Sequence, residues 1–82
     1  MEFNVQTVIL WQPDTPTLIQ RQAIYDAWDS LVAQGLAGGT PIIEPGPSGT
    51  RVIRHWATVE AAANWVTYCN DYPGIISADI IP

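Results

Sequence analysis

The segment 50–57 (TRVIRHWA) constrains the fold more than any other part of the chain. A turn rich in Pro and Gly precedes it, and Thr58 follows it as a suitable helix N-cap, so the segment between them is predicted to be a strand. Because side chains alternate along a strand, its two faces differ in chemistry. Arg51, Ile53 and His55 share one face, and Val52, Arg54 and Trp56 share the other.

Local signals divide the rest of the chain into five further elements. Thr15 is a suitable N-cap and Pro16 a suitable first helical residue, because the missing N–H of proline costs nothing at that position. Gly35 is suited to follow the end of that helix. The expected elements in chain order are a strand at 3–11, a helix at 16–34, a short strand at 41–44, the strand at 50–57, a helix at 59–72 and a strand at 75–81.

This order predicts a single α+β domain over residues 1–82, the ferredoxin-like βαββαβ plait. In that plait the antiparallel sheet has the order fourth, first, third, second strand, so segment 50–57 is central. Both helices cover one face and the other face is open. Pro41 restricts the second strand to an edge, where a missing N–H breaks no ladder bond.

The burial cost of a charge predicts which face of segment 50–57 is open. An unpaired arginine under the helices costs several kcal/mol, about 3–5 once relaxation is included. We therefore expect Ile53 to face the helices, with Arg51 and His55 at the rim. Val52, Arg54 and Trp56 then lie on the open face, where Arg54 forms a polar row with Gln6 and Asp79.

Composition favours a self-associating protein. Only 13% of the 82 residues are charged and 48% are hydrophobic, so a lone monomer has few charges to cover its surface. A chain of this length buries a marginal core, and its single Cys69 allows no internal disulfide. We therefore predict a homodimer or higher oligomer.

The acidic balance excludes some partners. A net charge of -5 with three arginines and no lysine disfavours nucleic acid. No apolar run approaches the ~20 residues of a membrane span, so no membrane partner is expected. Residues 1–4 show no secretory signal, which predicts a cytoplasmic setting. The chain has no Cys/His cluster, and we expect neither a metal nor another cofactor.

Two functions remain open. The open face either packs against a second copy for assembly or partner interaction, or a pocket between sheet and helices binds a small hydrophobic or anionic molecule. The candidate residues for the interface or ligand site are Arg54, Trp56, His55, Gln6 and Asp79. His55 is either a general base or structural, and Cys69 is expected to be a core residue. Catalytic residues, and whether the protein is an enzyme, stay undefined.

The stretch from Arg54-His55-Trp56 through Thr58-Val59-Glu60-Ala61-Ala62 to Trp65 resembles the dimeric α+β-barrel group of monooxygenase-like proteins. The resemblance implies a homodimer whose open sheets form a barrel, sometimes around a small organic substrate. It further implies that Arg54 and Trp56, together with His55, line the interior of that barrel.

Overall fold

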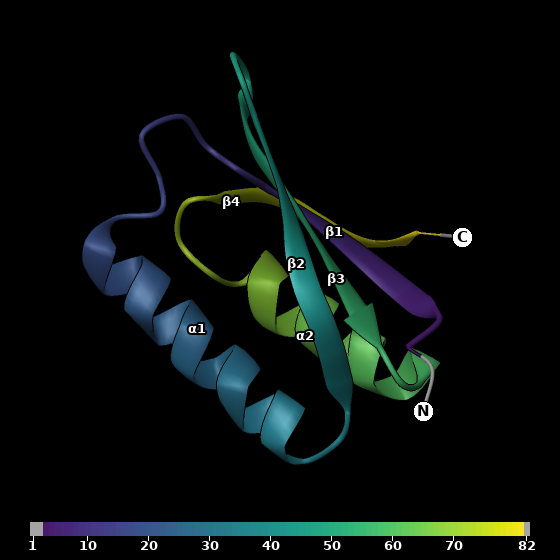
Figure 1. Cartoon of the computed structure of the whole chain (residues 1–82). Helices are drawn as coiled ribbons and strands as arrows, with labels where there is room; N and C mark the ends of the chain where they lie inside the picture. Colours follow the sequence, from purple (N-terminus) through teal and green to yellow (C-terminus); the bar gives the residue numbers. More distant parts are fainter. Residues whose placement is uncertain (1–2, 82) are drawn as a thin grey trace.

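The computed structural model describes residues 3–81 and contains four strands and two helices (Figure 1). Met1 and Glu2, which contribute to the expectation of no secretory signal, lie outside the described residues. The elements are β1 (Val5–Trp11), α1 (Leu18–Ala33), β2 (Ala37–Gly46), β3 (Gly49–Trp56), α2 (Val59–Asn70) and β4 (Ile75–Ile81). Their order is the predicted one, although β2 extends beyond the predicted strand at 41–44 in both directions.

The four strands form one antiparallel sheet in the order β2-β3-β1-β4. An α+β domain with an antiparallel sheet and two helices is therefore confirmed, as is the central position of β3. Thr7 of β1 pairs with Arg54 of β3, and Val8 pairs with Ile53. The strand β2, which contains Pro41 and Pro45, lies at one edge of the sheet. Proline is tolerated there because an edge strand leaves some N–H groups unpaired.

Both helices pack on the sheet face that carries Arg54 and Trp56, so the predicted orientation of β3 is wrong. Arg54 is 3% exposed and Trp56 is 0% exposed. Burying a Trp side chain removes about 150–250 Å² from water, at about 25 cal/mol per Å². This gain, about 4–6 kcal/mol, matches or exceeds the cost of the arginine. Because strand side chains alternate, Trp56 cannot be buried without Arg54.

The opposite face of the sheet is covered by neither helix. Ile53 and His55 lie on this face, and so do Gln6 and Asp79, because Gln6 pairs with His55 and Val8 pairs with both Ile53 and Asp79. The predicted orientations of β1 and of Asp79 are confirmed. The predicted polar row is wrong, because Arg54 lies on the other side of the sheet from Gln6 and Asp79.

The helix N-termini follow from local capping. The Thr58 hydroxyl accepts a hydrogen bond from the Ala61 N–H (3.1 Å), which confirms the predicted start of α2. The predicted start of α1 at Thr15-Pro16 is wrong, because Thr17 is the N-cap. Its hydroxyl accepts from the Gln20 N–H (3.2 Å), and the Gln20 side chain accepts from the Thr17 N–H (2.9 Å). This reciprocal capping box satisfies two N–H groups, which a cap at Thr15 does not.

A cluster of three tryptophans joins the helices to the sheet. Trp28 of α1 packs edge-on against Trp56 of β3, with ring centroids 5.3 Å apart. Trp65 of α2 lies 5.4 Å from Trp56 and 6.3 Å from Trp28. This packing turns α2 so that Ala61 and Trp65 are buried, whereas Val59 is 62% exposed.

We predict that Thr7→Val destabilises the fold by about 1–3 kcal/mol, because it leaves a buried N–H without an acceptor. The Trp56 indole N–H donates to the Thr7 hydroxyl at 2.9 Å, and both side chains are buried. Valine keeps the shape and strand propensity of threonine. Urea unfolding measures the change, with Thr67→Ala on the exposed side of α2 as the control, expected within about 0.5 kcal/mol of wild type. Equal stability of Thr7→Val and wild type would show that the bond contributes nothing.

Candidate functional site

Arg54 is a buried cation held between two aromatic rings. Its guanidinium carbon lies 5.3 Å from the ring centroid of Trp28 and 5.3 Å from that of Trp65. One ring comes from α1 and the other from α2, so the guanidinium occupies the seam between the helices. Cation–π contacts of this kind contribute about 2 kcal/mol when desolvated. They explain how the fold tolerates the charge, but they supply no hydrogen-bond acceptor.

The guanidinium of Arg54 lacks a carboxylate partner. Its Nε and Nη1 atoms are buried and make no hydrogen bond within the described part of the chain. Within residues 3–81 the only ion pair joins Arg51 to Glu44 (3.6 Å), and it lies at the surface. Burial lowers the pKa of Arg54, and the neighbouring Cys69 and Tyr25 oppose that change. Arginine remains charged under such conditions. Arg54 is therefore a cation in a low-dielectric site, and the described part of the chain supplies no counter-charge.

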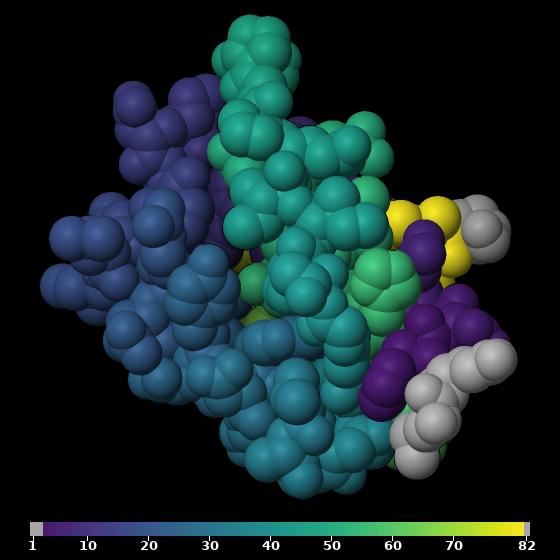
Figure 2. Space-filling model, in the orientation of Figure 1, coloured from purple at the N-terminus to yellow at the C-terminus, as the bar shows by residue number. Residues whose placement is uncertain are grey.

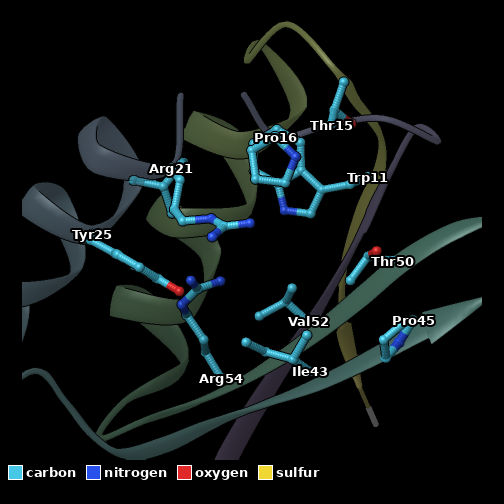
Figure 3. A pocket seen from close by; sticks show the side chains of 11 residues that line it. Trp11, Thr15, Pro16, Arg21, Tyr25, Ile43, Pro45, Thr50, Val52 and Arg54 are labelled. Atoms are coloured by element: carbon cyan, nitrogen blue, oxygen red, sulfur yellow. The ribbon is translucent and has the colours of Figure 1, made fainter. Parts of the chain in front are cut away.

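A cavity of about 290 Å³ opens beside this guanidinium. Figure 2 shows the molecule hollowed between α1 and β2, and Figure 3 shows the side chains around the hollow. Two cations project into it, Arg54 from β3 and Arg21 from α1, and Tyr25 directs its hydroxyl toward Arg54 (Figure 3). The remaining lining residues are Trp11, Thr15, Pro16, Ile24, Ile43, Pro45, Thr50 and Val52.

The lining of the cavity fits an amphipathic anion. It holds two guanidinium groups and three hydroxyl groups, it has several apolar walls, and it contains no carboxylate. Guanidinium groups bind carboxylates and phosphates through paired N–H donors. A concave, largely apolar site with a few convergent polar groups is typical of a small-molecule site. The arrangement can hold a negative charge at α1 and an apolar body against the sheet.

The structure separates the predicted site residues into two groups. Arg54 lines the cavity, and Trp56 lies beneath the helices with its N–H bonded to Thr7. On the opposite face the side-chain Nε2 atoms of Gln6 and His55 lie 3.1 Å apart in a cross-strand hydrogen bond. Asp79 is exposed on that same face. The histidine and the arginine, adjacent in sequence, therefore cannot act on one ligand.

Sequence reasoning missed Arg21 and Tyr25, which complete the polar side of the cavity. They are four residues apart in α1, a spacing that places two side chains next to each other on one helix face. That spacing is visible in the sequence. That the two residues belong to a site depends on Arg54 of β3 facing the same cavity, which the local sequence pattern does not show.

Cys69 lies near Arg54 but is not a reactive thiol. Burial raises its pKa to about 12, and the charge of Arg54 opposes that rise. The expected role of Cys69 as a small core residue fits its burial in the core cluster. Residues 3–81 contain no group of three His, Cys, Asp or Glu side chains that could hold a metal ion. Neither helix is long and apolar enough to cross a membrane.

We predict that Arg54→Met leaves stability unchanged or raises it by about 1–4 kcal/mol, because methionine fills the same space without a desolvated charge. If the arginine stabilised the fold, its replacement by methionine would lower the free energy of unfolding. Chemical denaturation measures the free energy of unfolding. Arg51→Met is the matched control, since it removes an arginine from a half-exposed surface ion pair and is expected to change stability by less than about 0.5 kcal/mol. A loss of more than 2 kcal/mol in Arg54→Met, about the worth of a desolvated cation–π contact, would identify Arg54 as a structural residue.

We predict that the Cys69 thiol makes folding less favourable at alkaline pH. Its pKa is about 12 in the folded protein and about 8.5 in an unfolded chain, so the unfolded state loses its proton first. The contribution to stability is full below about pH 8.5 and falls as the pH rises toward 12. The free energy of unfolding at pH 7 and pH 10 checks this. Cys69→Ala should lose less stability between these values than wild type, and an equal loss would refute the assignment.

A scan against protein-family models, a search of curated proteins and a search of solved structures each found no match to this chain.

Proposed function

We propose that this protein binds a small organic anion in the cavity between α1, β2 and β3, with Arg54 as the charge that retains it. The observation that carries the proposal is a buried, unpaired guanidinium at the wall of a cavity. More than nine in ten buried polar groups in proteins have a hydrogen-bond partner, so an unpaired guanidinium at a cavity wall supports a ligand that supplies the acceptor.

The energetics of burial support an anionic ligand. The fold has already met the desolvation cost of Arg54, and an anion that enters the cavity gains attraction in a low-dielectric site. A neutral ligand gains no such term. The cavity also concentrates positive charge in a protein whose net charge is -5, since two of the three arginines line it. Electrostatic attraction is therefore local to the cavity and does not extend over the whole surface.

The tryptophans provide an intrinsic reporter for binding. Trp28 and Trp65 contact the Arg54 guanidinium, and Trp11 lines the cavity, so ligand binding should change their fluorescence. We expect a saturable change when small organic anions are titrated into the wild-type protein. A charged hydrogen-bonding contact contributes about 1.5–3 kcal/mol, so Arg54→Met should weaken binding by about 10- to 150-fold.

The control variant for this titration is Arg51→Met, which removes the same charge from the opposite face of β3. It should bind as wild type does. Equal weakening in both variants would indicate a general effect of net charge. Unchanged binding in Arg54→Met would refute the assignment of Arg54.

The open face of the sheet supports a second function, self-association. Strands β1, β3 and β4 present apolar side chains on this face, and neither helix covers them. These side chains include Val8, Leu10, Ile53 and Ile81. The element order and the sheet order support a ferredoxin-like plait, in which this face is free. A homodimer formed through two such faces would leave the cavity on the outer, helical side. Assembly and ligand binding are therefore compatible in one protein.

We predict that wild-type protein is dimeric at micromolar concentration and that Ile53→Asp makes it monomeric, because a charge at the centre of an apolar interface is left desolvated. Light scattering measures the molar mass. Val59→Asp is the control, since Val59 is an exposed apolar residue in the first turn of α2, where an acidic side chain favours the helix. A wild-type monomer with Ile53→Asp unchanged would rule out this interface.

A further inference from the structure

We infer, on the basis of the proposed anion site, that its ligand is a monocarboxylate with a flat apolar body, and that Arg21 from α1 and Arg54 from β3 together clamp the carboxylate. The proposal assigns a binding role to Arg21, which belongs to α1, in addition to that of Arg54 from β3.

The two guanidinium groups face the same space. Figure 3 shows Arg21 extending from α1 over the cavity and Arg54 rising toward it from the sheet. Two positive charges that face the same space repel each other, and proteins commonly offset this repulsion with an acidic side chain between them. None of the lining residues is an acid, and Arg21 appears in no ion pair of the described chain. A bound carboxylate would take that place and relieve the repulsion.

The distribution of donors favours a carboxylate over a phosphate. Arg21, Arg54 and the Tyr25 hydroxyl lie together at the α1 side of the cavity (Figure 3). A planar carboxylate has two oxygens, which this one-sided set can satisfy with paired guanidinium bonds. A phosphate carries more charge and distributes its oxygens in all directions. Much of the remaining lining is apolar, so some of these oxygens would face side chains that donate no hydrogen bond.

The apolar walls and the volume define the rest of the ligand. The apolar part of the lining consists of Trp11, Ile24, Ile43 and Val52, together with the rings of Pro16 and Pro45. Aromatic and apolar surfaces of this kind favour a flat hydrophobic body. A volume of about 290 Å³ lies just below the ~300–1,000 Å³ range of ligand sites. It therefore suits a body of one or two rings.

Ligand binding should also tie α1 to the sheet. Arg21 and Tyr25 lie on α1, whereas Arg54 and Val52 lie on β3, so a carboxylate between them bridges two elements. A ligand that binds only the folded state raises the melting temperature. Thermal denaturation therefore gives a readout that is independent of tryptophan fluorescence.

The test compares 2-naphthoate, its neutral counterpart 2-naphthamide and inorganic phosphate. Calorimetric titration and thermal denaturation are applied to wild type, Arg54→Met, Arg54→Lys and Arg21→Gln, with Arg51→Gln as the surface control. We expect 2-naphthoate to bind wild type at least tenfold more tightly than either 2-naphthamide or phosphate. Arg21→Gln should weaken 2-naphthoate about tenfold and leave 2-naphthamide unchanged. Arg54→Lys keeps the charge but loses the paired donors, so it should fall between wild type and Arg54→Met.

The outcomes separate the ligand class from the anion site itself. Phosphate binding as tight as 2-naphthoate, still dependent on Arg54, would overturn the carboxylate class and leave the proposed function standing. Equal affinity of wild type and Arg21→Gln for 2-naphthoate would overturn the clamp. Absence of binding by both anions, or binding unaffected by either Arg54 variant, would overturn the proposed function and this inference with it. Arg21 is exposed, so Arg21→Gln tests the clamp without threatening the fold.

Discussion

The contact among Trp28, Trp56 and Trp65 is the interaction on which this small domain depends. Each ring comes from a different element, so their packing holds α1, α2 and β3 together. The first helix also packs Ile24, Ala27 and Leu31 against the core, and its Gln20 side-chain amide donates to the Pro73 carbonyl at 3.1 Å. Cavities nevertheless lie between α1 and the sheet and between α1 and α2. The space beside α1 leaves room for a ligand.

The same cluster brings a charge into the core. Arg54 is two residues before Trp56, and strand alternation places both side chains on one face. The tryptophans then stack on the guanidinium and lower the cost of its burial, but they leave its Nε and Nη1 donors without acceptors. The physical tension is between aromatic packing and an unpaired cation. The anionic ligand that we propose would resolve it, which connects the packing of the fold to the proposed function.

The two faces of the sheet provide separate chemical settings. The helical face holds Arg54 in a low-dielectric cavity. The open face carries the Gln6–His55 hydrogen bond within an apolar surround, which suits contact between copies of the chain. Neighbouring residues of β3 thus serve different surfaces, and the chemically rich segment 50–57 is not one site. Substitutions on one face should leave the properties of the other largely unaltered.

Sequence alone determined the local features of this protein. The Pro- and Gly-rich turn, the Thr58 cap, the edge position of the proline-containing strand and the order of elements all depend on neighbouring residues. The tertiary structure decided which face of β3 is buried. Both faces carry an arginine and apolar residues, so the pattern within segment 50–57 does not distinguish them. The choice came from Trp28 and Trp65, which lie far away in sequence and bury Trp56. The meeting of Arg21 with Arg54 has the same origin, because helix packing creates a site that neither segment contains.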